Sequence, residues 1–421
     1  MISPRRRRGH RANGTRSLRA LRLCGASIAL WLVACQASGG PNPGSRPWAR
    51  GESPSPPSTN QAAPRLGGIF TRTSEPGSVG RAQLEAATLA VEAINAAGGV
   101  RRPSGPQQPL ELVAYDDDGS AEQATLAMRS LVEEDRVVAI VGPGQRESVP
   151  DAARLAERAG VPLVTLAAIP GDLTARRWTF SLGPDDGAAL DALFAYLAAS
   201  GAERLGWIAP RTATAAAVRS RLVRLASSMD VRIVAEEEYN LAEESFGDRL
   251  ARLSTAGAQQ IVGWPREASD AASLARAAVE RAPRAQLFLG PAAATTSFLT
   301  LAGEAGPGSW VVVVRLQVVD QLWDEDPLTP VVRDFRRAYR LRFEHDPPAA
   351  AAPAWDAIRL VAQALGVSGL DRSGLRDTIE STRAFVGAAG AIAFEPGRHT
   401  GLDQHAFLVA RAVRGGWRIP P

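Results

Sequence analysis

Residues 137–166 read VVAIVGPGQRESVPDAARLAERAGVPLVTL, and this stretch decides the fold. It begins with an apolar run at 137–141, passes through a Gly-rich turn, and continues as a helical pattern at 149–158 before a second apolar run at 162–166. Short apolar runs that alternate with helical patterns predict a parallel sheet covered by helices. Because both runs are apolar almost throughout, we expect their strands to be buried on both faces.

The same alternation continues on both sides of this stretch, so we predict an α/β fold with two doubly wound lobes. Gly98 and Gly99 predict the end of the first helix, and residues 118–120 (DGS) predict an N-cap before the second. No short repeat is present, so a solenoid is not expected. Strands are expected at 66–70, 110–115, 137–141, 162–166, 178–182, 204–208, 231–239, 260–264, 286–289, 310–314, 391–394 and 406–412. Helices are expected at 83–97, 121–134, 149–158, 213–227, 246–255, 268–281, 331–343, 354–365 and 375–381.

The composition fits two globular lobes with accessory segments, since 421 residues with 45% hydrophobic content can bury more core than one ordinary domain holds. All 48 basic residues are Arg, and the absence of Lys excludes Schiff-base chemistry and a P-loop lysine. The first 35 residues hold eight Arg and no acid, which leaves 40 Arg against 44 Asp and Glu in the remainder. The remainder is therefore weakly acidic, and we expect no nucleic-acid partner.

The first 35 residues have the pattern of an export signal. Several Arg precede an apolar run at 23–34, which is too short for a membrane span of roughly 20 residues. Residues 32–35 (LVAC) predict a lipobox in which Cys35 receives a lipid; the alternative is a small apolar Cys in an ordinary signal peptide. Cys24 and Cys35 are the only cysteines, so no disulfide is expected in the exported body. Residues 36–64 are rich in Pro, Gly and Ser and predict a disordered tether.

Several strings, in chain order, resemble the leucine/isoleucine/valine-binding family of type I periplasmic binding proteins. Residues 137–166 are one of them, with their strand, Gly loop, helix and next strand. The others are residues 80–100 (GRAQLEAATLAVEAINAAGGV), 110–128 (LELVAYDDDGSAEQATLAM), 353–365 (PAWDAIRLVAQAL) and 390–401 (GAIAFEPGRHTG). The resemblance covers the chain from about residue 65 to the C-terminus and is strongest before residue 170.

The resemblance implies two αβα lobes joined by three crossings, with a ligand enclosed where the carboxyl ends of both sets of strands face each other. That place agrees with the general rule for open α/β sheets. The chain is then divided into a signal peptide at 1–35, a tether at 36–64 and a binding domain at 65–421. Within the binding domain we expect lobe I at about 65–184 and 316–385, lobe II at about 185–315, and a C-terminal hairpin at 386–421.

The loops after the strands are expected to line the cleft. In the family, an α-amino acid is held by hydroxyls and backbone amides of the first lobe, while an acid of the second lobe takes its ammonium. This chain departs from that pattern, because Arg146 and Ile169 stand where hydroxyl residues are usual and the segment before Ile169 reads Thr-Leu-Ala-Ala. Ala292 stands where the acid is expected, and Thr214 stands near an expected aromatic residue. The predicted cleft loops are 71–79, 142–148, 167–172, 210–214, 264–267 and 290–292.

Arg146 is the leading candidate for a ligand contact, because a guanidinium beside a helix N-terminus near Ser148 can bind a carboxylate with two hydrogen bonds. The alternative is an exposed Arg paired with Glu147 or another surface acid. Trp264 follows a strand and can stack on a ligand ring, or equally pack at the lobe edge. We therefore predict a carboxylate-bearing ligand without a free ammonium. The predicted ligand residues are Arg146, Ser148, Ala167, Ala168, Thr214, Trp264 and Arg266.

Other polar groups have a structural interpretation. The acids at 116–118 lack the further ligands of a calcium loop, so we expect them to form a turn and an N-cap. His399, Asp403 and His405 have no helical register and no Cys partner, so no metal site is predicted. At 355–356 the pair Trp-Asp predicts a core aromatic residue beside a capped or ion-paired acid.

The sequence carries no G-x-S-x-G, H-E-x-x-H, C-x-x-C or completed G-x-G-x-x-G motif, so we expect neither an enzyme nor a cofactor. The resemblance implies an exported, lipid-anchored solute-binding protein, in the periplasm or at the cell surface, that delivers a small molecule to an ABC transporter permease. The alternative is a lipoprotein of the same fold that regulates a cell-wall enzyme. Gln36 favours it, since lipoproteins without Asp at that position go to the outer membrane in many two-membrane bacteria. A sensor's ligand-binding domain is disfavoured, because no membrane helix or signalling domain follows.

Overall fold

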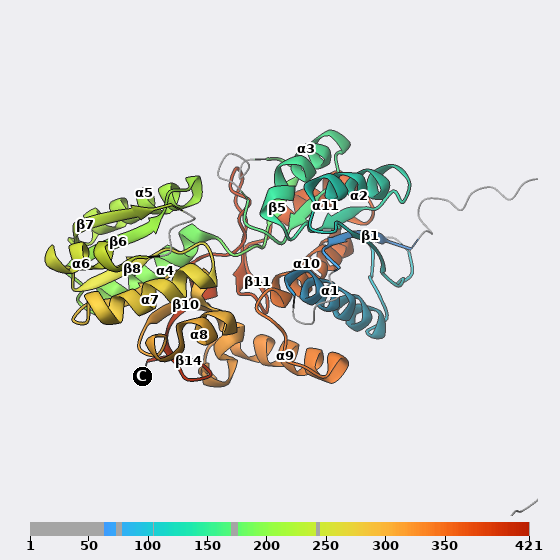
Figure 1. The fold of residues 1–421 in the computed structure, drawn as a ribbon. Coiled ribbons are helices and arrows are strands. Elements are labelled where there is room, and N and C mark those ends of the chain that lie inside the picture. Colours follow the sequence, from blue (N-terminus) through green and yellow to red (C-terminus); the bar gives the residue numbers. More distant parts are fainter. Residues whose placement is uncertain (1–62, 73–77, 104, 170–175, 241–244, 421) are drawn as a thin grey trace, which may run out of the picture. The chain divides into compact units, whose positions relative to one another are not determined.

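The computed structural model describes residues 63–72, 78–103, 105–169, 176–240 and 245–420. They form two large sheets covered by helices and one small two-stranded sheet (Figure 1). The predicted signal peptide, Cys35 and nearly all of the predicted tether lie outside the described residues. Of the helices in the described residues, none is long and apolar enough to cross a membrane.

The first sheet has five parallel strands in the order β2-β1-β3-β4-β5. The chain starts near one edge, moves outward and then returns past its starting strand, which is a doubly wound order. The five strands are β1 (Arg65–Phe70), β2 (Glu111–Asp116), β3 (Ala139–Val141), β4 (Leu163–Thr165) and β5 (Thr179–Ser181).

The inner strands β1, β3 and β4 of the first sheet are buried on both faces, as their apolar runs predict, whereas the edge strand β2 is only partly buried. Ile69 and Ile140 lie in a core with residues of α2 and α3, whereas Leu66 and Phe70 lie in the core that contains residues of α1 and α10. The helices of this part of the chain are α1 (Val79–Ala96), α2 (Ala121–Glu133), α3 (Val149–Ala159), α9 (Thr329–Phe343), α10 (Ala351–Ser368) and α11 (Arg372–Glu380). Of these, α10 packs along α1 and α11 packs on α10. We call this sheet with its helices the first lobe.

The second sheet has seven strands in the order β14-β13-β10-β9-β8-β6-β7. The pairs from β7 to β10 are parallel, and β13 joins β10 antiparallel, so the apolar tail predicted at 406–412 becomes part of this sheet. The strands are β6 (Arg204–Pro210), β7 (Arg232–Tyr239), β8 (Gln260–Gly263), β9 (Gln286–Leu289), β10 (Trp310–Val314), β13 (Phe407–Val413) and β14 (Gly416–Arg418).

Five helices cover the second sheet, and we call this sheet with its helices the second lobe. In one group α4 packs against α5, and in the other α7 packs against both α6 and α8. Two of them, α4 and α8, are not among the helices that the sequence predicts. The five are α4 (Asp186–Ala199), α5 (Ala213–Ser228), α6 (Gly247–Thr255), α7 (Ala268–Arg281) and α8 (Thr296–Ala302).

Three segments connect the lobes, and the predicted α/β fold with two doubly wound lobes is confirmed. The first runs from β5 to α4, the second from β10 to α9, and the third from α11 to β13. The third segment contains the two-stranded sheet of β11 (Phe385–Val386) and β12 (Ala391–Ile392). The predicted strand at 391–394 is therefore shorter than expected.

Candidate functional site

The loop after β3 is held close to β1 by glycine. Gly142 has a φ of +98°, and a Cβ at this position would lie 2.2 Å from the carbonyl oxygen of Ile69. Only glycine fits both constraints. The chain then forms a short 3-10 turn, Arg146–Ser148, and enters α3 with Pro150 in its first turn. The turn places the Arg146 side chain at the carboxyl end of the first sheet.

Arg146 is paired with an acid of the second lobe. Its Nη2 donates a hydrogen bond to Oδ2 of Asp186 at 3.2 Å, and its side chain is 42% exposed. Asp186 is the first residue of α4, which packs on α5 and on β13. In this structure Arg146 therefore pairs with an acid, as in the second of its two interpretations. That acid is Asp186 rather than Glu147.

Trp264 reaches the same carboxylate from the loop after β8. Its Nε1 donates a hydrogen bond to Oδ1 of Asp186 at 3.1 Å. Its ring is 4% exposed and stacks on Trp207 with the ring centroids 6.4 Å apart. A Cβ on Gly290 would lie 2.8 Å from this ring, so the indole fills the space beside β9. In this structure Trp264 therefore packs at the lobe edge, which is one of the two roles that the sequence allows for it.

Asp186 thus joins two of the six predicted cleft loops, because Arg146 and Trp264 each bond one of its oxygens. Burial raises the pKa of the Asp186 carboxyl, and the charge of Arg146 and the hydrogen bond from Trp264 oppose that rise. Asp185 precedes it and uses its own carboxylate to cap α4, accepting a bond from the backbone N–H of Ala188 at 2.8 Å. The site is therefore a partly buried acid held by a cation and an indole.

The other predicted residues of the first lobe are buried near this loop. Ser148 is 1% exposed, and its Oγ has no hydrogen-bond partner in the described part of the chain. Ala167 and Ala168 are 8% and 6% exposed, and the carbonyl oxygen of Ala167 accepts bonds from the hydroxyls of Thr165 and Ser181. Ile169 packs with Ala167 against the start of α3. These residues shape the loop after β4, and the predicted continuation at 170–172 lies outside the described residues.

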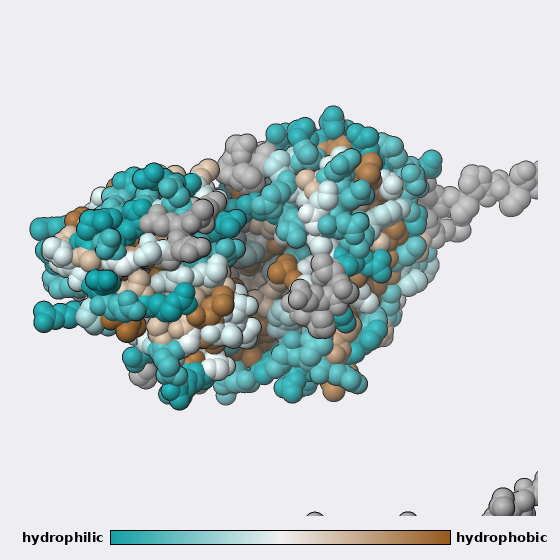
Figure 2. Space-filling view, viewed as in Figure 1, coloured by the Kyte–Doolittle hydropathy of each residue, from teal (hydrophilic) through white to brown (hydrophobic). Residues whose placement is uncertain are grey.

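Two predicted residues of the second lobe have no bond to the Arg146 pair among the contacts of the described residues. Thr214 is the second residue of α5, and it is half-buried. Arg266 is 54% exposed, and its Nη2 lies 3.6 Å from Oε1 of Glu267. Ala292 lies in a short 3-10 turn after β9, so no acid enters from that loop. The face of the molecule drawn in Figure 2 is mainly hydrophilic and is hollowed near its centre, where apolar residues are exposed.

The acids at 116–118 form a turn, as predicted. Oδ1 of Asp116 accepts the N–H of Asp118 at 2.9 Å, and Oδ1 of Asp117 accepts the Thr71 hydroxyl at 2.7 Å. The N-cap of α2, however, is Ser120 rather than one of these acids, because its Oγ accepts from the N–H at Gln123. Within the described residues no group of three His, Cys, Asp or Glu side chains is placed to hold a metal ion.

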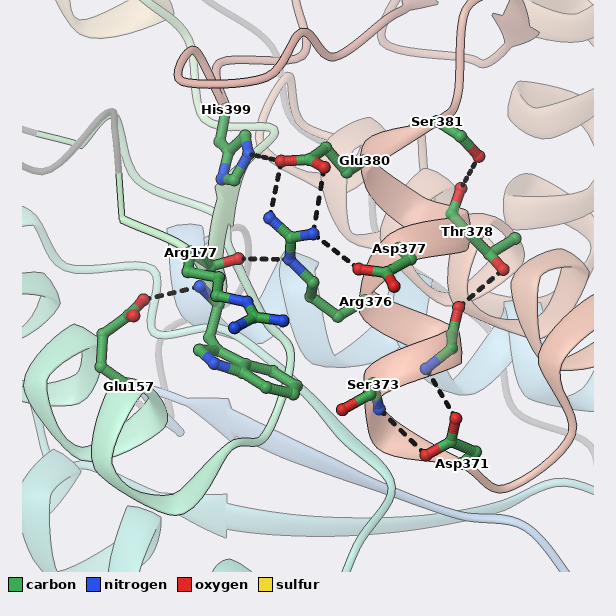
Figure 3. A network of polar contacts seen from close by, with 12 residues as sticks. Glu157, Arg177, Asp371, Ser373, Arg376, Asp377, Thr378, Glu380, Ser381 and His399 are labelled. Carbon is green, nitrogen blue, oxygen red and sulfur yellow. Dashed lines mark hydrogen bonds and ion pairs between the residues drawn. The ribbon is translucent and has the colours of Figure 1, made fainter.

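His399 is a structural residue of the third connecting segment (Figure 3). Its imidazole is 1% exposed, with Nδ1 3.0 Å from the carbonyl oxygen of Thr179 and Nε2 2.9 Å from Oε1 of Glu380. Glu380 also accepts two bonds from Arg376, and the His399 ring stacks on Phe180 at 4.3 Å. The network ties the third segment to β5 and α11.

Asp356 of α10 binds the backbone of the same segment. It is the capped acid that the Trp-Asp pair at 355–356 predicts. Its two oxygens accept the backbone N–H groups of Ala388 and Ala389 at 2.8 and 2.7 Å. Burial is the largest cause that raises its pKa to about 6, and the two backbone bonds oppose it. Asp356 therefore fixes the turn between β11 and β12.

The acid of this candidate site that the sequence interpretation missed is Asp186. It lies in the string Gly-Pro-Asp-Asp-Gly at 183–187, directly before an apolar stretch. An Asp before an apolar run is an N-cap signal, so the start of α4 was accessible from the sequence. Its two partners come from distant loops, however, and only the fold brings them together.

Comparisons with known proteins agree with this architecture. The family model described as "Periplasmic binding protein" matches residues 64–416. A leucine-, isoleucine-, valine-, threonine- and alanine-binding protein of Pseudomonas aeruginosa is 24% identical over 298 residues, which is 69% of this chain and 74% of that protein.

Among solved structures, a putative branched-chain amino acid ABC transporter protein from Rhodospirillum rubrum is similar with a TM-score of 0.70 and 24% identity over 85% of this chain and all of that one. A branched-chain amino acid transporter substrate binding protein from Streptococcus pneumoniae, in complex with isoleucine, gives a TM-score of 0.65 and 21% identity over 83% of this chain and all of that one. These structures share the type I periplasmic binding fold that the sequence predicts. The match of the family model over residues 64–416, on two doubly wound lobes with three connections, shows that this chain belongs to the periplasmic binding protein family.

Proposed function

We propose that this protein is an extracytoplasmic solute-binding protein that encloses a small molecule between its two lobes. The observation that carries the proposal is the meeting of the loops after β3 and β8 at Asp186, because ligands of open α/β sheets bind beyond the carboxyl ends of the strands. The relatives named above support the role, since the Pseudomonas protein is described as binding amino acids and the Streptococcus protein was solved with isoleucine.

The ligand we propose is amino-acid-like or a small carboxylate, and we favour one without a free ammonium. Arg146 is 42% exposed, and Nη2 is the only one of its nitrogens with a hydrogen bond to the described residues. Its remaining N–H groups are free to bind a carboxylate. The loop at 290–292 brings no acid to pair with an ammonium, and an unpaired buried charge is costly.

We propose further that Cys35 carries a lipid and that the protein delivers its ligand to an ABC importer. The support is the LVAC string behind an Arg-rich segment, the family membership, and the transporter descriptions of the structural relatives. The protein then works outside the cytoplasm as a membrane-anchored binding protein, and its relatives are binding proteins rather than enzymes.

Calorimetry on the purified exported chain tests the proposal. The ligands are leucine, isoleucine, valine, threonine and alanine, with benzoate, phenylacetate and succinate as carboxylates that lack an ammonium. We expect saturable 1:1 binding of a carboxylate without an ammonium. Binding of leucine or valine with none of the acids would show that the cleft residues are assigned wrongly, and no binding by either class would contradict the solute-binding function for these solutes.

A further inference from the structure

The charge of Arg146 is already paired without a ligand, because the protein itself provides a carboxylate. Asp186 holds Arg146 by one oxygen at 3.2 Å and Trp264 by the other at 3.1 Å. The acid side chain is 25% exposed and the Arg side chain 42%, so the ion pair is partly withdrawn from solvent but still accessible. A ligand carboxylate that reaches this guanidinium therefore comes next to a second negative charge.

The charged and polar neighbours of Asp186 come from several elements. Arg146 comes from the turn before α3, Trp264 from the loop after β8, and Asp185 from its own helix. Asp185 adds a like charge, and its carboxylate is committed to the cap of α4. Arg146 is thus the cation that bonds Asp186. A second cation, Arg221 of α5, lies beside Gly187, but its guanidinium is paired with Asp191.

We propose that Asp186 is a specificity-determining residue, an internal carboxylate that occupies Arg146 in the free protein and that an anionic ligand has to displace. The inference rests on the proposed function, since it concerns the ligand contact of Arg146. Its consequence is a selection among solutes. A weakly held anion cannot displace Asp186, whereas a ligand with further contacts in the cleft can, so binding is restricted to carboxylates that also fill the rest of the site.

The competition also links ligand binding to protons. A protonated Asp186 no longer attracts Arg146 as an ion and no longer repels the incoming carboxylate. Burial already favours the protonated form of this residue. The affinity for an anionic ligand should therefore rise as the pH falls, as long as the ligand itself stays ionised.

The test compares the wild type with Asp186→Asn, which keeps an oxygen for the Trp264 N–H but removes the charge. The matched control is Asp334→Asn, since Asp334 lies on α9 and pairs with Arg337 instead. Benzoate is titrated into each protein by calorimetry at about pH 7.5 and about pH 5.5. We expect Asp186→Asn to bind benzoate about tenfold more tightly than the wild type at the higher pH, and Asp334→Asn to match the wild type. We also expect the wild type to tighten at the lower pH and Asp186→Asn to lose that pH dependence.

An Asp186→Asn variant that binds benzoate no better than the wild type, with the same pH dependence, overturns the proposal. Asp186→Ser gives the same comparison with a smaller side chain, and circular dichroism checks that both variants fold. Titration with leucine distinguishes a failure of the solute-binding function from a failure of the proposed role of Asp186. If leucine binds the wild type and Asp186→Asn equally, while benzoate binds neither, the solute-binding function stands and the role of Asp186 falls.

Discussion

The indole Nε1 of Trp264 lies 3.1 Å from Oδ1 of Asp186, so the residue that follows β8 bonds the first residue of α4. The other oxygen of that carboxylate takes Arg146 of the first lobe. Two residues from distant parts of the chain are therefore linked by one acid. Replacement of Trp264 by Phe should keep a smaller aromatic ring beside Gly290 and remove the hydrogen bond. We expect the free energy of unfolding to fall by about 1 to 3 kcal/mol, because a bond to a charged group is lost. Urea unfolding measures this change, and an unchanged midpoint would show that the bond adds nothing to stability.

Arg146→Ala should weaken the binding of a carboxylate ligand by roughly 1.5 to 3 kcal/mol, the usual contribution of hydrogen bonds to charged groups. The exposed Arg266 provides the control, since its neighbour is Glu267 and Arg266→Ala should leave the affinity unchanged. Calorimetry with the tightest carboxylate of the panel measures both variants. Equal losses in the two variants would mean that Arg146 acts only through the overall charge of the protein.

His399→Phe should keep the stacking on Phe180 and lose two hydrogen bonds. Both ring nitrogens face acceptors, Thr179 O and Glu380 Oε1. The free energy of unfolding should fall by about 2 to 4 kcal/mol, since one of the bonds is to a carboxylate. His405 is exposed, and His405→Gln should change stability by no more than about 0.5 kcal/mol. A comparable loss in both variants would contradict the structural role of His399.

Asp356 predicts a specific pH dependence of stability. Its pKa in the folded protein is about 6, against 3.8 for an ordinary Asp, so the folded state binds the proton more tightly. The stabilisation that this proton gives is complete below about pH 4 and is lost as the pH rises through about 6. Asp356→Asn cannot titrate. Its stability relative to the wild type, measured by urea unfolding, should therefore improve between pH 4 and pH 6.5, and a constant difference would contradict the raised pKa.

Metabolic labelling with a fatty acid tests the lipid anchor at Cys35. We expect label on the wild type and none on Cys35→Ala, because no other cysteine follows in the chain. Cys24→Ala is the matched control, since Cys24 lies inside the predicted signal peptide and its loss should leave labelling intact. Equal labelling of wild type and Cys35→Ala would exclude Cys35 as the acceptor.

Most of the fold was predictable, because apolar runs alternate clearly with helical patterns. The strands Gln286–Leu289 and Trp310–Val314 begin and end where the sequence predicts. The helix α4 was not predicted, since its residues are apolar on nearly all sides and give no helical period; Leu190, Leu193 and Phe194 are all buried. Its exposed residues Ala195, Ala198 and Ala199 are alanines, so the helix lacks the polar face on which sequence prediction depends.

The site was less predictable, for a different reason. The loops that carry Arg146 and Trp264 follow from the position of strand ends, which the apolar runs mark. The relationship of both residues to Asp186 depends on where the first connecting segment enters the second lobe, and no local pattern contains that information. Likewise His399 lies in a loop, and its contacts are to Thr179 and Glu380, which lie 220 and 19 residues away in the chain.

Small-angle scattering tests most directly whether the two lobes enclose a small molecule. The exported chain is measured alone and with a saturating concentration of the tightest carboxylate from the calorimetric panel. We predict a smaller radius of gyration and a hinge-type change of the distance distribution when the ligand is bound. Identical scattering curves at demonstrated saturation would contradict enclosure of the ligand between the lobes.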